Sequence, residues 1–270
     1  MKSKTENNPR YALITGASSG IGEAIARYAA QQGFNVGLCA RRVERLEAIA
    51  HELKTQYHVQ ADVLVTDLSK AGAADELIKR VEGLGRSVDV LVNNAGASVA
   101  PIFTQTNIER QKAFLELTVS TPVTLSHGVL PHMMQKNWGR IINISSIMAL
   151  SSGGKGHTLY PAGKSFLLKM SQSMSAEMAS KNIHISAVLP GVVSTDFQVA
   201  NGGKPVAPSR FSQTAQQVAE EAWRRNERGD EIIVPGLSAK IGAVFLRYTP
   251  ERFMRFLTRP VAAKYYEDNQ

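Results

Sequence analysis

Tyr160 and Lys164 are of the right types and spacing to transfer a proton together. On a helix, residues four apart lie on one face. A tyrosine hydroxyl has a usual pKa near 10, and a neighbouring ammonium group would favour its ionised form. Ser145 and Ser146 end a predicted strand upstream, where a serine hydroxyl could hold a carbonyl oxygen by a hydrogen bond. These residues predict acid-base chemistry on a carbonyl or an alcohol.

A glycine-rich stretch, Thr15-Gly16-Ala17-Ser18-Ser19-Gly20-Ile21-Gly22, follows the first predicted strand and leads into a helix. Glycines permit a tight turn, and they let backbone N–H groups approach a pyrophosphate at the positive end of the helix. The strand-turn-helix context favours a dinucleotide site over a turn that only packs. The residues predicted to bind the cofactor here are Gly16, Ser18, Ser19, Gly20, Ile21 and Gly22.

The same stretch also reads as Gly-x-Ser-x-Gly, the nucleophile elbow of α/β-hydrolases. Ser18 would then be the nucleophile of an acyl transfer. The hydrolase fold, however, builds its oxyanion hole partly from an earlier strand and loop, and only one strand precedes Ser18. The sequence therefore disfavours the hydrolase.

Arg41 and Arg42 follow the second predicted strand. At this point of a dinucleotide site, an acidic residue binds a free ribose 2′-hydroxyl and an arginine binds a 2′-phosphate. No acid is present here, and guanidinium groups form the charge-assisted hydrogen bonds that suit phosphate. The pair favours NADP over NAD. The alternative is that both side chains only begin the next helix in solvent.

Short runs rich in Val and Ile alternate with stretches of helical period, which predicts βαβ units. Leu46, Ile49, Ala50 and Leu53 mark one buried helical face. The predicted strands cover 11–14, 36–40, 59–65, 88–92, 140–145, 183–189 and 231–234. The other predicted helices lie near 23–32, 71–84, 107–136, 160–180 and 214–228. We therefore expect an α/β fold with a Rossmann-type, doubly wound parallel sheet of about seven strands in a single domain, with its ligand crevice at the carboxyl ends of the strands.

The composition of the 270 residues, with 43% hydrophobic and 20% charged residues, is that of a soluble globular protein. No apolar run reaches the ~20 residues of a membrane-spanning helix. The polar start of the chain lacks the apolar region of a signal peptide, so a cytoplasmic location is expected. Cys39 is the sole cysteine, which excludes an intrachain disulfide, and we predict no metal site. The net charge of +8 comes without a nucleic-acid motif, so no nucleic-acid partner is predicted.

Five motifs occur in the order seen in the short-chain dehydrogenase/reductase family. They are Thr15-Gly16-x-x-x-Gly20-x-Gly22, Asn93-Asn94-Ala95-Gly96, Ser146, Tyr160-x-x-x-Lys164 and Pro190-Gly191. The chain resembles a family member over about residues 9–235. The resemblance implies an NADP(H)-dependent oxidoreductase that transfers a hydride between the nicotinamide and a carbonyl or secondary alcohol.

The resemblance also implies roles for single residues. Tyr160 would be the proton donor, Lys164 would bind the nicotinamide ribose and tune Tyr160, and Ser146 would orient the carbonyl. Asn93 would stabilise the sheet beside the cofactor, and Asp67 would contact the adenine. The other cofactor contacts it implies are Leu68, Ala95, Gly96, Pro190, Gly191, Val193 and Thr195, of which Val193 and Thr195 would touch the nicotinamide amide.

Two features depart from the family pattern. Thr118 stands where the family has the asparagine of its proton relay, and a hydroxyl offers fewer hydrogen-bonding groups than an amide. The step from Ser146 to Tyr160 is about one residue longer than expected, which the glycine-rich loop between them could absorb. Ser145 remains the alternative to Ser146.

The substrate end is predicted to be covered by a lid over 196–211, with its glycines and prolines. The apolar side chains of the lid are Phe197, Val199 and Phe211. Together with Met148 and Ile102, they favour a lipophilic substrate. His157 lies close to Tyr160 in sequence, but a lone loop histidine is more typical of surface or packing.

The chain is expected to comprise a flexible tail over 1–8, the catalytic domain over 9–235 and a helical extension over 236–270. In the extension, Ile241, Val244, Phe245 and Tyr248 form one stripe with basic residues around it. Such a stripe is predicted to pack on its own domain or on a second subunit. A basic amphipathic helix can also lie on an anionic membrane, which the sequence does not favour. We expect a homodimer formed through the long helices, with a tetramer as the alternative.

Two other functions stay open. A 3-oxoacyl-thioester reductase would share all of this chemistry, and its basic surface would receive an acidic carrier protein or coenzyme A. A regulatory protein that binds NADPH without efficient turnover is suggested by Thr118 at the relay position.

Overall fold

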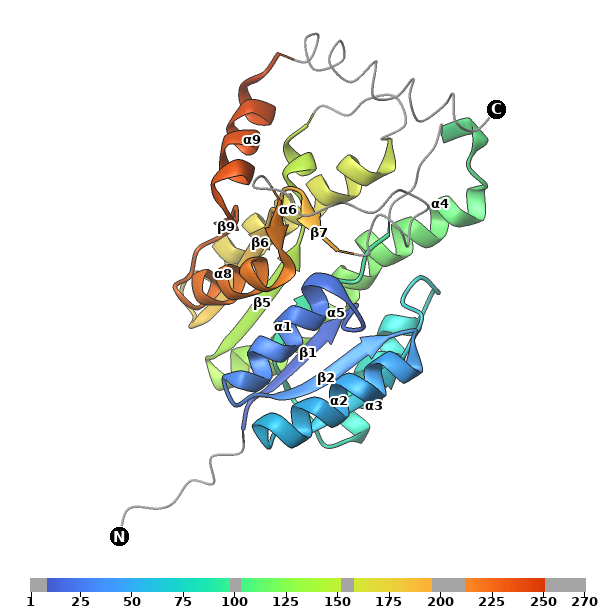
Figure 1. Ribbon diagram of the computed structural model, residues 1–270, viewed down its shortest axis with the longest axis vertical. Coiled ribbons are helices and arrows are strands. Elements are labelled where there is room, and N and C mark those ends of the chain that lie inside the picture. The colour runs from blue at the N-terminus through green and yellow to red at the C-terminus, as the bar shows by residue number, and fades with distance from the viewer. Residues whose placement is uncertain (1–8, 98–102, 152–157, 196–211, 251–270) are drawn as a thin grey trace.

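The runs rich in Val and Ile form one seven-stranded parallel sheet in the computed structural model of the chain (Figure 1). The structure describes residues 9–97, 103–151, 158–195 and 212–250. The sheet has the order β3-β2-β1-β4-β5-β6-β9, so the winding reverses between β1 and β4. Its strands are β1 (Tyr11–Thr15), β2 (Asn35–Ala40), β3 (Ala61–Val65), β4 (Val88–Asn93), β5 (Gly139–Ile144), β6 (Ile183–Val188) and β9 (Ile232–Ile233). The predicted Rossmann-type fold is confirmed.

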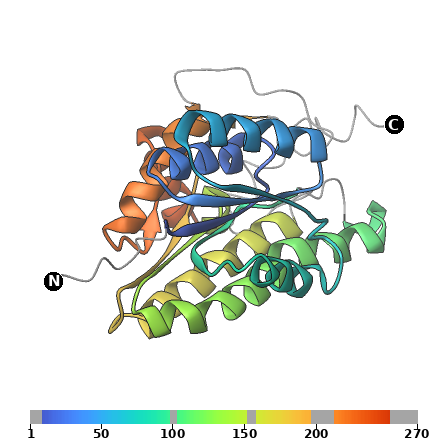
Figure 2. The same cartoon turned by 90° about the horizontal axis from the view of Figure 1, so that it is seen from below.

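Helices cover both faces of the sheet (Figure 2). The helices α1 (Gly20–Gln31), α2 (Val43–Tyr57) and α8 (Ala215–Glu227) lie on one face. On the other lie α3 (Ala73–Gly83), α4 (Ile108–Leu115), α5 (Thr121–Lys136) and α6 (Leu159–Glu177). A strand covered on both faces buries every side chain, which explains why β1, β4 and β5 are buried throughout. The predicted inner face of α2, from Leu46 to Leu53, is buried.

Most predicted boundaries hold within two residues, and Gly33 ends α1 with a positive φ of 82°. The long helix predicted over 107–136 is wrong as a single element. A π-helical turn, η2 (Glu116–Ser120), joins α4 to α5. Such a turn changes the hydrogen bonding from i→i+4 to i→i+5 over five residues only, which is too short a stretch for the apolar period to reveal it.

Four short elements were not predicted. They are two 3₁₀ turns, η1 (Phe103–Gln105) and η3 (Ile147–Leu150), and a small parallel ladder between β7 (Val193–Ser194) and β8 (Gln213–Thr214). The last strand of the large sheet, β9, pairs through two residues only, which is shorter than the predicted 231–234. Elements this short carry too little periodicity to be recognised from sequence.

The helix α9 (Leu237–Tyr248) follows Gly236, as the predicted extension requires. In the described part of the chain, the predicted stripe of this helix is largely exposed. Ile241, Val244 and Tyr248 are more than half exposed, and the residues buried against the domain are Ala239 and Ala243. Packing of the stripe on a second subunit stays a prediction.

Several predicted features lie outside the described residues: the tail over 1–8, the lid over 196–211, Ile102, His157 and residues 251–270. Within the described residues, no helix is both long and apolar enough to cross a membrane.

Candidate active site

A cleft of about 570 Å³ opens at the carboxyl ends of the central strands, where a doubly wound sheet binds its ligands. It contains most of the residues that were singled out from the sequence. The predicted residues that line it are Gly16, Ser18, Ser19, Gly20, Ile21, Arg41, Arg42, Asp67, Leu68, Ala95, Gly96, Ser146, Tyr160, Lys164, Pro190, Gly191, Val193 and Thr195. Gly22, Asn93 and Thr118 lie behind this lining, and Met148 is not part of it.

The glycine loop is shaped by close approaches that exclude larger side chains. Gly16 and Gly20 have positive φ angles of 66° and 59°. A Cβ on Gly22 would lie 2.3 Å from the backbone oxygen of Gly16, and one on Gly16 would lie 2.6 Å from Nδ2 of Asn94. The loop ends at Ser19, whose side chain makes no capping bond to α1. The positive end of α1 therefore meets the cleft without a side-chain cap, as a phosphate site requires.

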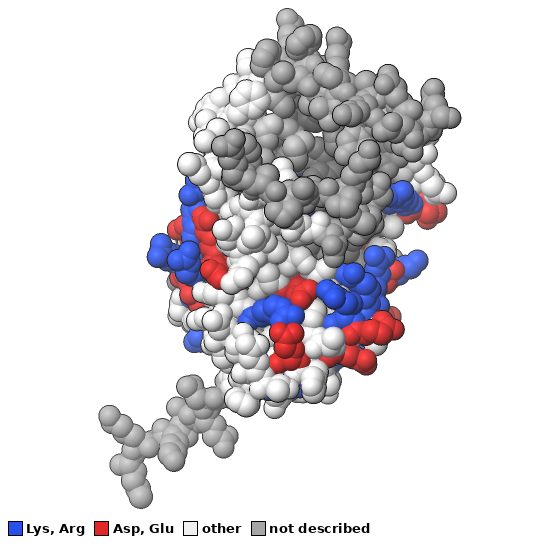
Figure 3. Space-filling view, in the orientation of Figure 1, with Lys and Arg blue, Asp and Glu red and all other residues white. Residues whose placement is uncertain are grey.

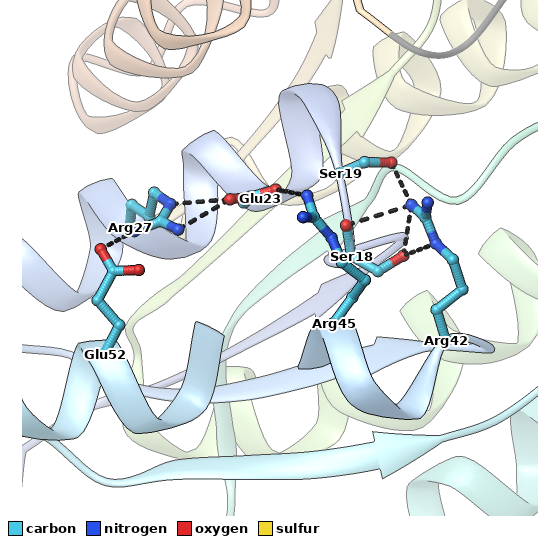
Figure 4. A network of polar contacts seen from close by, with 7 residues as sticks. All are labelled: Ser18, Ser19, Glu23, Arg27, Arg42, Arg45 and Glu52. Atoms are coloured by element: carbon cyan, nitrogen blue, oxygen red, sulfur yellow. Dashed lines mark hydrogen bonds and ion pairs between the residues drawn. The ribbon is translucent and has the colours of Figure 1, made fainter. Parts of the chain in front are cut away.

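Arg42 is hydrogen-bonded to this loop (Figure 4). Its Nη2 donates to Oγ of Ser19 at 2.6 Å and to Oγ of Ser18 at 3.1 Å, and its Nε lies 3.2 Å from the same Ser18 oxygen. Arg45, in the first turn of α2, instead pairs with Glu23 at 3.4 Å. Among the described residues, neither Arg41 nor Arg42 forms an ion pair with a carboxylate. Two guanidinium charges thus remain at this end of the cleft.

Asp67 follows β3 at the same end. Burial favours the neutral form of this carboxyl group, but hydrogen bonds from Oγ and N of Ser69, at 2.7 and 3.1 Å, oppose it. With the nearby charges of Arg41 and Lys70, these bonds hold the pKa of Asp67 below its usual value. The carboxylate is thereby kept as an acceptor at neutral pH.

Two asparagines at the end of β4 have separate structural roles. Asn93 is buried, and its Nδ2 donates to Oδ1 of Asn143 at 2.8 Å, which ties β4 to β5 below the cleft. Asn94 donates from Nδ2 to the backbone oxygen of Thr15 at 2.8 Å, and the Thr15 hydroxyl accepts from the backbone N–H groups of Asn94 and Ala95. These bonds hold the glycine loop against the end of β4.

Tyr160 and Lys164, which we call the α6 pair, lie at the other end of the cleft, next to the end of β5. Nζ of Lys164 donates to the backbone oxygen of Ile144 at 2.8 Å and lies 5.9 Å from the ring centroid of Tyr160. Burial lowers the pKa of Lys164 to about 8. Burial also raises the pKa of Tyr160, and a hydrogen bond with the Ser146 side chain counteracts this increase.

The two serines differ in their hydrogen bonds. The Ser145 hydroxyl donates to the backbone oxygen of Lys164 at 2.7 Å, which fastens α6 to β5. The Ser146 hydroxyl accepts from the backbone N–H of Met148 at 3.1 Å and bonds to Tyr160. The Ser146 and Tyr160 hydroxyls therefore lie on the same side of the cleft.

Thr118 lies in the π-helical turn and is 1% exposed. Its Oγ1 has no hydrogen-bond partner among the described residues. Its methyl group packs against α6, because a Cβ on Gly163 would lie only 2.9 Å from Cγ2 of Thr118. The hydroxyl is therefore placed beside the segment that carries Tyr160 and Lys164.

Comparison with known proteins decides the family. The model of the short chain dehydrogenase family matches residues 10–204, which include the glycine loop and the α6 pair. The chain belongs to the short-chain dehydrogenase family. The nucleophile-elbow interpretation of Ser18 is therefore wrong, and in this short-chain dehydrogenase the Ser18 hydroxyl accepts a bond from Arg42.

Relatives of this short-chain dehydrogenase cover most of its length. Nodulation protein G of Rhizobium sp. (strain N33) is 37% identical over 186 residues, which are 69% of this chain and 74% of the relative. The 3-oxoacyl-acyl-carrier-protein reductase of Aquifex aeolicus (strain VF5) is 30% identical over 188 residues, 70% of this chain and 75% of that protein. A short-chain dehydrogenase from Sphingobium yanoikuyae, solved in complex with NADPH, superimposes with a TM-score of 0.78 at 28% identity. That match covers 87% of this chain and 92% of the other.

The cleft of this short-chain dehydrogenase also contains residues that sequence reasoning missed. Four of them come from α4 and the π-helical turn: Arg110, Ala113, Phe114 and Leu117. Their spacing of three, four and seven residues marks one helix face, so the helical period could have found them. Others follow strand ends, where position in the sheet could have found them: Thr66, Ser69, Asn94 and Ala97.

Proposed function

We propose that this chain is an NADP(H)-dependent oxidoreductase that transfers a hydride between the nicotinamide and a carbonyl or secondary alcohol, with Tyr160 as proton donor and acceptor. The observation that carries the proposal is a single cleft holding three features. These are the glycine loop at the start of α1, the two arginines after β2, and Tyr160 hydrogen-bonded to Ser146 beside Lys164.

The residues present fit a dinucleotide with a 2′-phosphate. The loop between β1 and α1 leaves no space for a Cβ at Gly16 or Gly22. The uncapped start of α1 suits a pyrophosphate, and Arg41 and Arg42 suit a 2′-phosphate because neither forms an ion pair with a described carboxylate. The Sphingobium yanoikuyae relative was solved with NADPH, which supports the same cofactor here. When bound, the cofactor supplies or accepts the hydride.

Each of the other cofactor contacts is proposed from its place in the cleft. Asp67 and Leu68 would contact the adenine, and Lys164 would bind the nicotinamide ribose. Val193 and Thr195 would contact the carboxamide. The remaining contacts are Ala95, Gly96, Pro190 and Gly191, whereas Asn93 would act from behind the lining by joining β4 to β5.

Tyr160 and Ser146 are the groups we assign to the substrate oxygen. Their hydroxyls are hydrogen-bonded to each other, so one oxygen placed between them could bond to both. Ser146 then orients the carbonyl, and Tyr160 passes its proton to the oxygen as negative charge develops there. The positive charge of Lys164 favours the ionised tyrosine that remains. Ser145 is the weaker candidate because its hydroxyl is bonded to the α6 backbone.

Thr118 is proposed to take part in proton transfer by holding a water molecule. Its buried hydroxyl has no described partner and lies in the turn that packs on α6. A hydroxyl in this position can both donate and accept, which is the minimum that a proton relay needs.

The proposed substrate is lipophilic, because Ala113, Phe114 and Leu117 add apolar groups to the cleft. A 3-oxoacyl thioester is the second candidate. The Aquifex aeolicus relative, a 3-oxoacyl-acyl-carrier-protein reductase, and the net charge of +8 favour it. A carrier protein with acidic surface would be attracted to such a basic protein.

The test is oxidation of NADPH and NADH followed by absorbance with ketones, aldehydes, quinones and 3-oxoacyl thioesters. We expect turnover that prefers NADPH, is lost in Tyr160→Phe and is retained in Tyr57→Phe, a control on α2 outside the cleft. Both variants should still bind NADPH. Preference for thioesters over simple ketones would support the second candidate. Full turnover by Tyr160→Phe would contradict the assignment, and NADPH binding without any turnover would favour the regulatory protein.

We also propose a homodimer built through the long helices. Large apolar side chains are exposed on α4, α5 and α6, among them Leu115, Val123 and Phe166. Light scattering coupled to size exclusion should give twice the chain mass, and Val123→Asp with Phe166→Asp should reduce it to that of one chain.

A further inference from the structure

The helix α9 turns a row of large apolar side chains outward, although it belongs to a folded domain. Leu237 and Tyr248 are each 74% exposed, Ile241 63%, Val244 60% and Phe245 48%. Their spacing of four, seven, eight and eleven residues from Leu237 places them on one side of the helix. We refer to these five residues as the α9 face. Exposed apolar side chains gathered in this way mark an interaction surface.

Small residues fix the orientation of α9. Ala239 and Ala243 are buried, and a Cβ on Gly191 would lie 3.0 Å from Cβ of Ala239. Gly242 approaches Ile147 of the η3 turn, where an added Cβ would lie 3.4 Å from its Cδ1. The helix thus approaches the domain too closely for large side chains on its inner side. The α9 face is held outward by this packing.

The charged side chains on α9 itself are of one sign. No Asp or Glu occurs between residues 232 and 250, whereas Lys240 and Arg247 are both exposed on the helix. Lys240 makes one long ion pair, at 3.9 Å, with Glu221 of α8. In sequence, residues 251–259 add three arginines and one glutamate. In Figure 3 the surface over α9, at the upper left, is uncharged, while blue and red side chains gather below it over α8 and lower down over α1 and α2.

A second copy of the chain fits this face poorly. A two-fold interface brings the same patch of both subunits together, so the cations of one α9 would approach those of the other without a compensating acid from either helix. Five side chains also fall short of the ~20–30 residues that each partner contributes to a stable protein interface. An apolar face flanked by cations has the composition of a helix that binds an anionic lipid surface.

We propose that the α9 face binds the surface of an anionic lipid bilayer. The apolar row would enter the boundary between head groups and acyl chains. Lys240 and Arg247 would reach the phosphates, because their long stems can lie along apolar surface while the charge stays in water. Tyr248 suits the same boundary through its ring and hydroxyl. Since α9 packs on Gly191, which lines the cleft, the bilayer would lie beside the substrate end of the site.

The test is flotation of the full chain with vesicles of phosphatidylcholine alone or mixed with phosphatidylglycerol. We expect binding to the mixed vesicles that weakens as salt is raised, and far less binding to phosphatidylcholine. The double variant Ile241→Ser with Phe245→Ser should lose about tenfold or more of this binding. The double variant Lys240→Glu with Arg247→Glu should lose a similar amount, because each cation near an anionic surface contributes about fivefold.

Val65→Ser with Leu84→Ser is the matched control, since both side chains are exposed and apolar but lie away from α9. This control should float like the parent chain, and all variants should keep their NADPH affinity and unfolding midpoint. Failure of the parent chain to bind mixed vesicles at low salt would overturn the proposal. Binding unaffected by the α9 variants would overturn it as well. A drop in oligomer mass of the α9 variants without lipid would assign the face to a second copy instead.

Discussion

Nζ of Lys164 lies 5.9 Å from the ring centroid of Tyr160, one helical turn away on α6, and donates to the backbone oxygen of Ile144 at 2.8 Å. The ammonium group is therefore fixed to the end of β5 before any ligand binds. The Ser145 hydroxyl strengthens the same junction by donating to the Lys164 carbonyl oxygen. Strand β5 thus sets the position of the lysine and, through α6, that of the tyrosine.

The buried ammonium group should make stability depend on pH. The pKa of Lys164 is lowered by burial to about 8 in the folded protein, against about 10.4 in an unfolded chain. Below pH 8 both states carry the charge, and the folded state bears the full cost of burying it. Between these two pKa values the unfolded state binds more protons, so the folded state gains stability as pH rises.

We therefore predict that the unfolding free energy of Lys164→Met exceeds that of the parent chain by a larger margin at pH 7 than at pH 10. The difference in unfolding free energy between the two proteins should shift by roughly 3 kcal/mol across this range. Urea unfolding of both proteins at each pH measures it. Lys169→Met, on the exposed side of α6, is the control and should show no comparable shift. An unchanged difference would mean that the ammonium group is well solvated.

Arg41→Ala should weaken NADPH much more than NADH. If Arg41 binds the 2′-phosphate, its loss removes one or two charge-assisted hydrogen bonds, worth roughly 10- to 100-fold in affinity. Dissociation constants for both cofactors, measured by fluorescence, give the ratio. Equal losses for NADPH and NADH would contradict a role at the 2′-phosphate.

Arg42→Ala should weaken both cofactors, because Arg42 also holds Ser18 and Ser19 of the loop that would meet the pyrophosphate. The same binding measurement separates this effect from that of Arg41. Arg45→Ala is the matched control, since Arg45 is exposed and pairs only with Glu23 among the described residues. It should change either affinity by less than about twofold, as expected for an exposed ion pair.

The sequence predicted the parallel sheet well because fully covered strands are continuous apolar runs, as in β1 and β4. It also placed the glycine loop and Ser146 at strand ends, and Tyr160 and Lys164 together on one helix. It could not predict the contact between Arg42 and the loop, which depends on side-chain direction across two elements. The inner side of α9 was missed for another reason. Ala239 is small, so it adds little to an apolar period that the larger exposed residues dominate.

Thr118→Val should lower kcat with little effect on KM. The variant keeps the shape of the side chain in the π-helical turn but removes the hydroxyl that we assign to a bound water. Because that hydroxyl has no described partner, the free energy of unfolding should stay the same or rise by about 1 kcal/mol. Steady-state kinetics and denaturant unfolding of the same preparations test both parts.

Thr118→Ser is the companion variant, since it retains the hydroxyl and removes the methyl group that packs near Gly163. It should retain most of kcat while losing some stability. Unchanged kcat in Thr118→Val would rule out a role in proton transfer. A loss of kcat in Thr118→Ser as large as that in Thr118→Val would reveal a packing role instead.

Gly163→Ala should reduce both stability and turnover, although alanine is normally favoured over glycine inside a helix by about 1 kcal/mol. The added Cβ would lie 2.9 Å from Cγ2 of Thr118 and 3.2 Å from the ring of Phe114, so α6 must move away from the turn. Overpacking of this kind costs about 1–3 kcal/mol, and a shift of about 1 Å in the helix that carries Tyr160 can reduce kcat by about 100-fold. Gly83→Ala, at the end of α3, meets no atom within 4 Å and should be neutral or stabilising. Equal stability and equal kcat of the two variants would show that the contact between α6 and the π-helical turn does not position the catalytic pair.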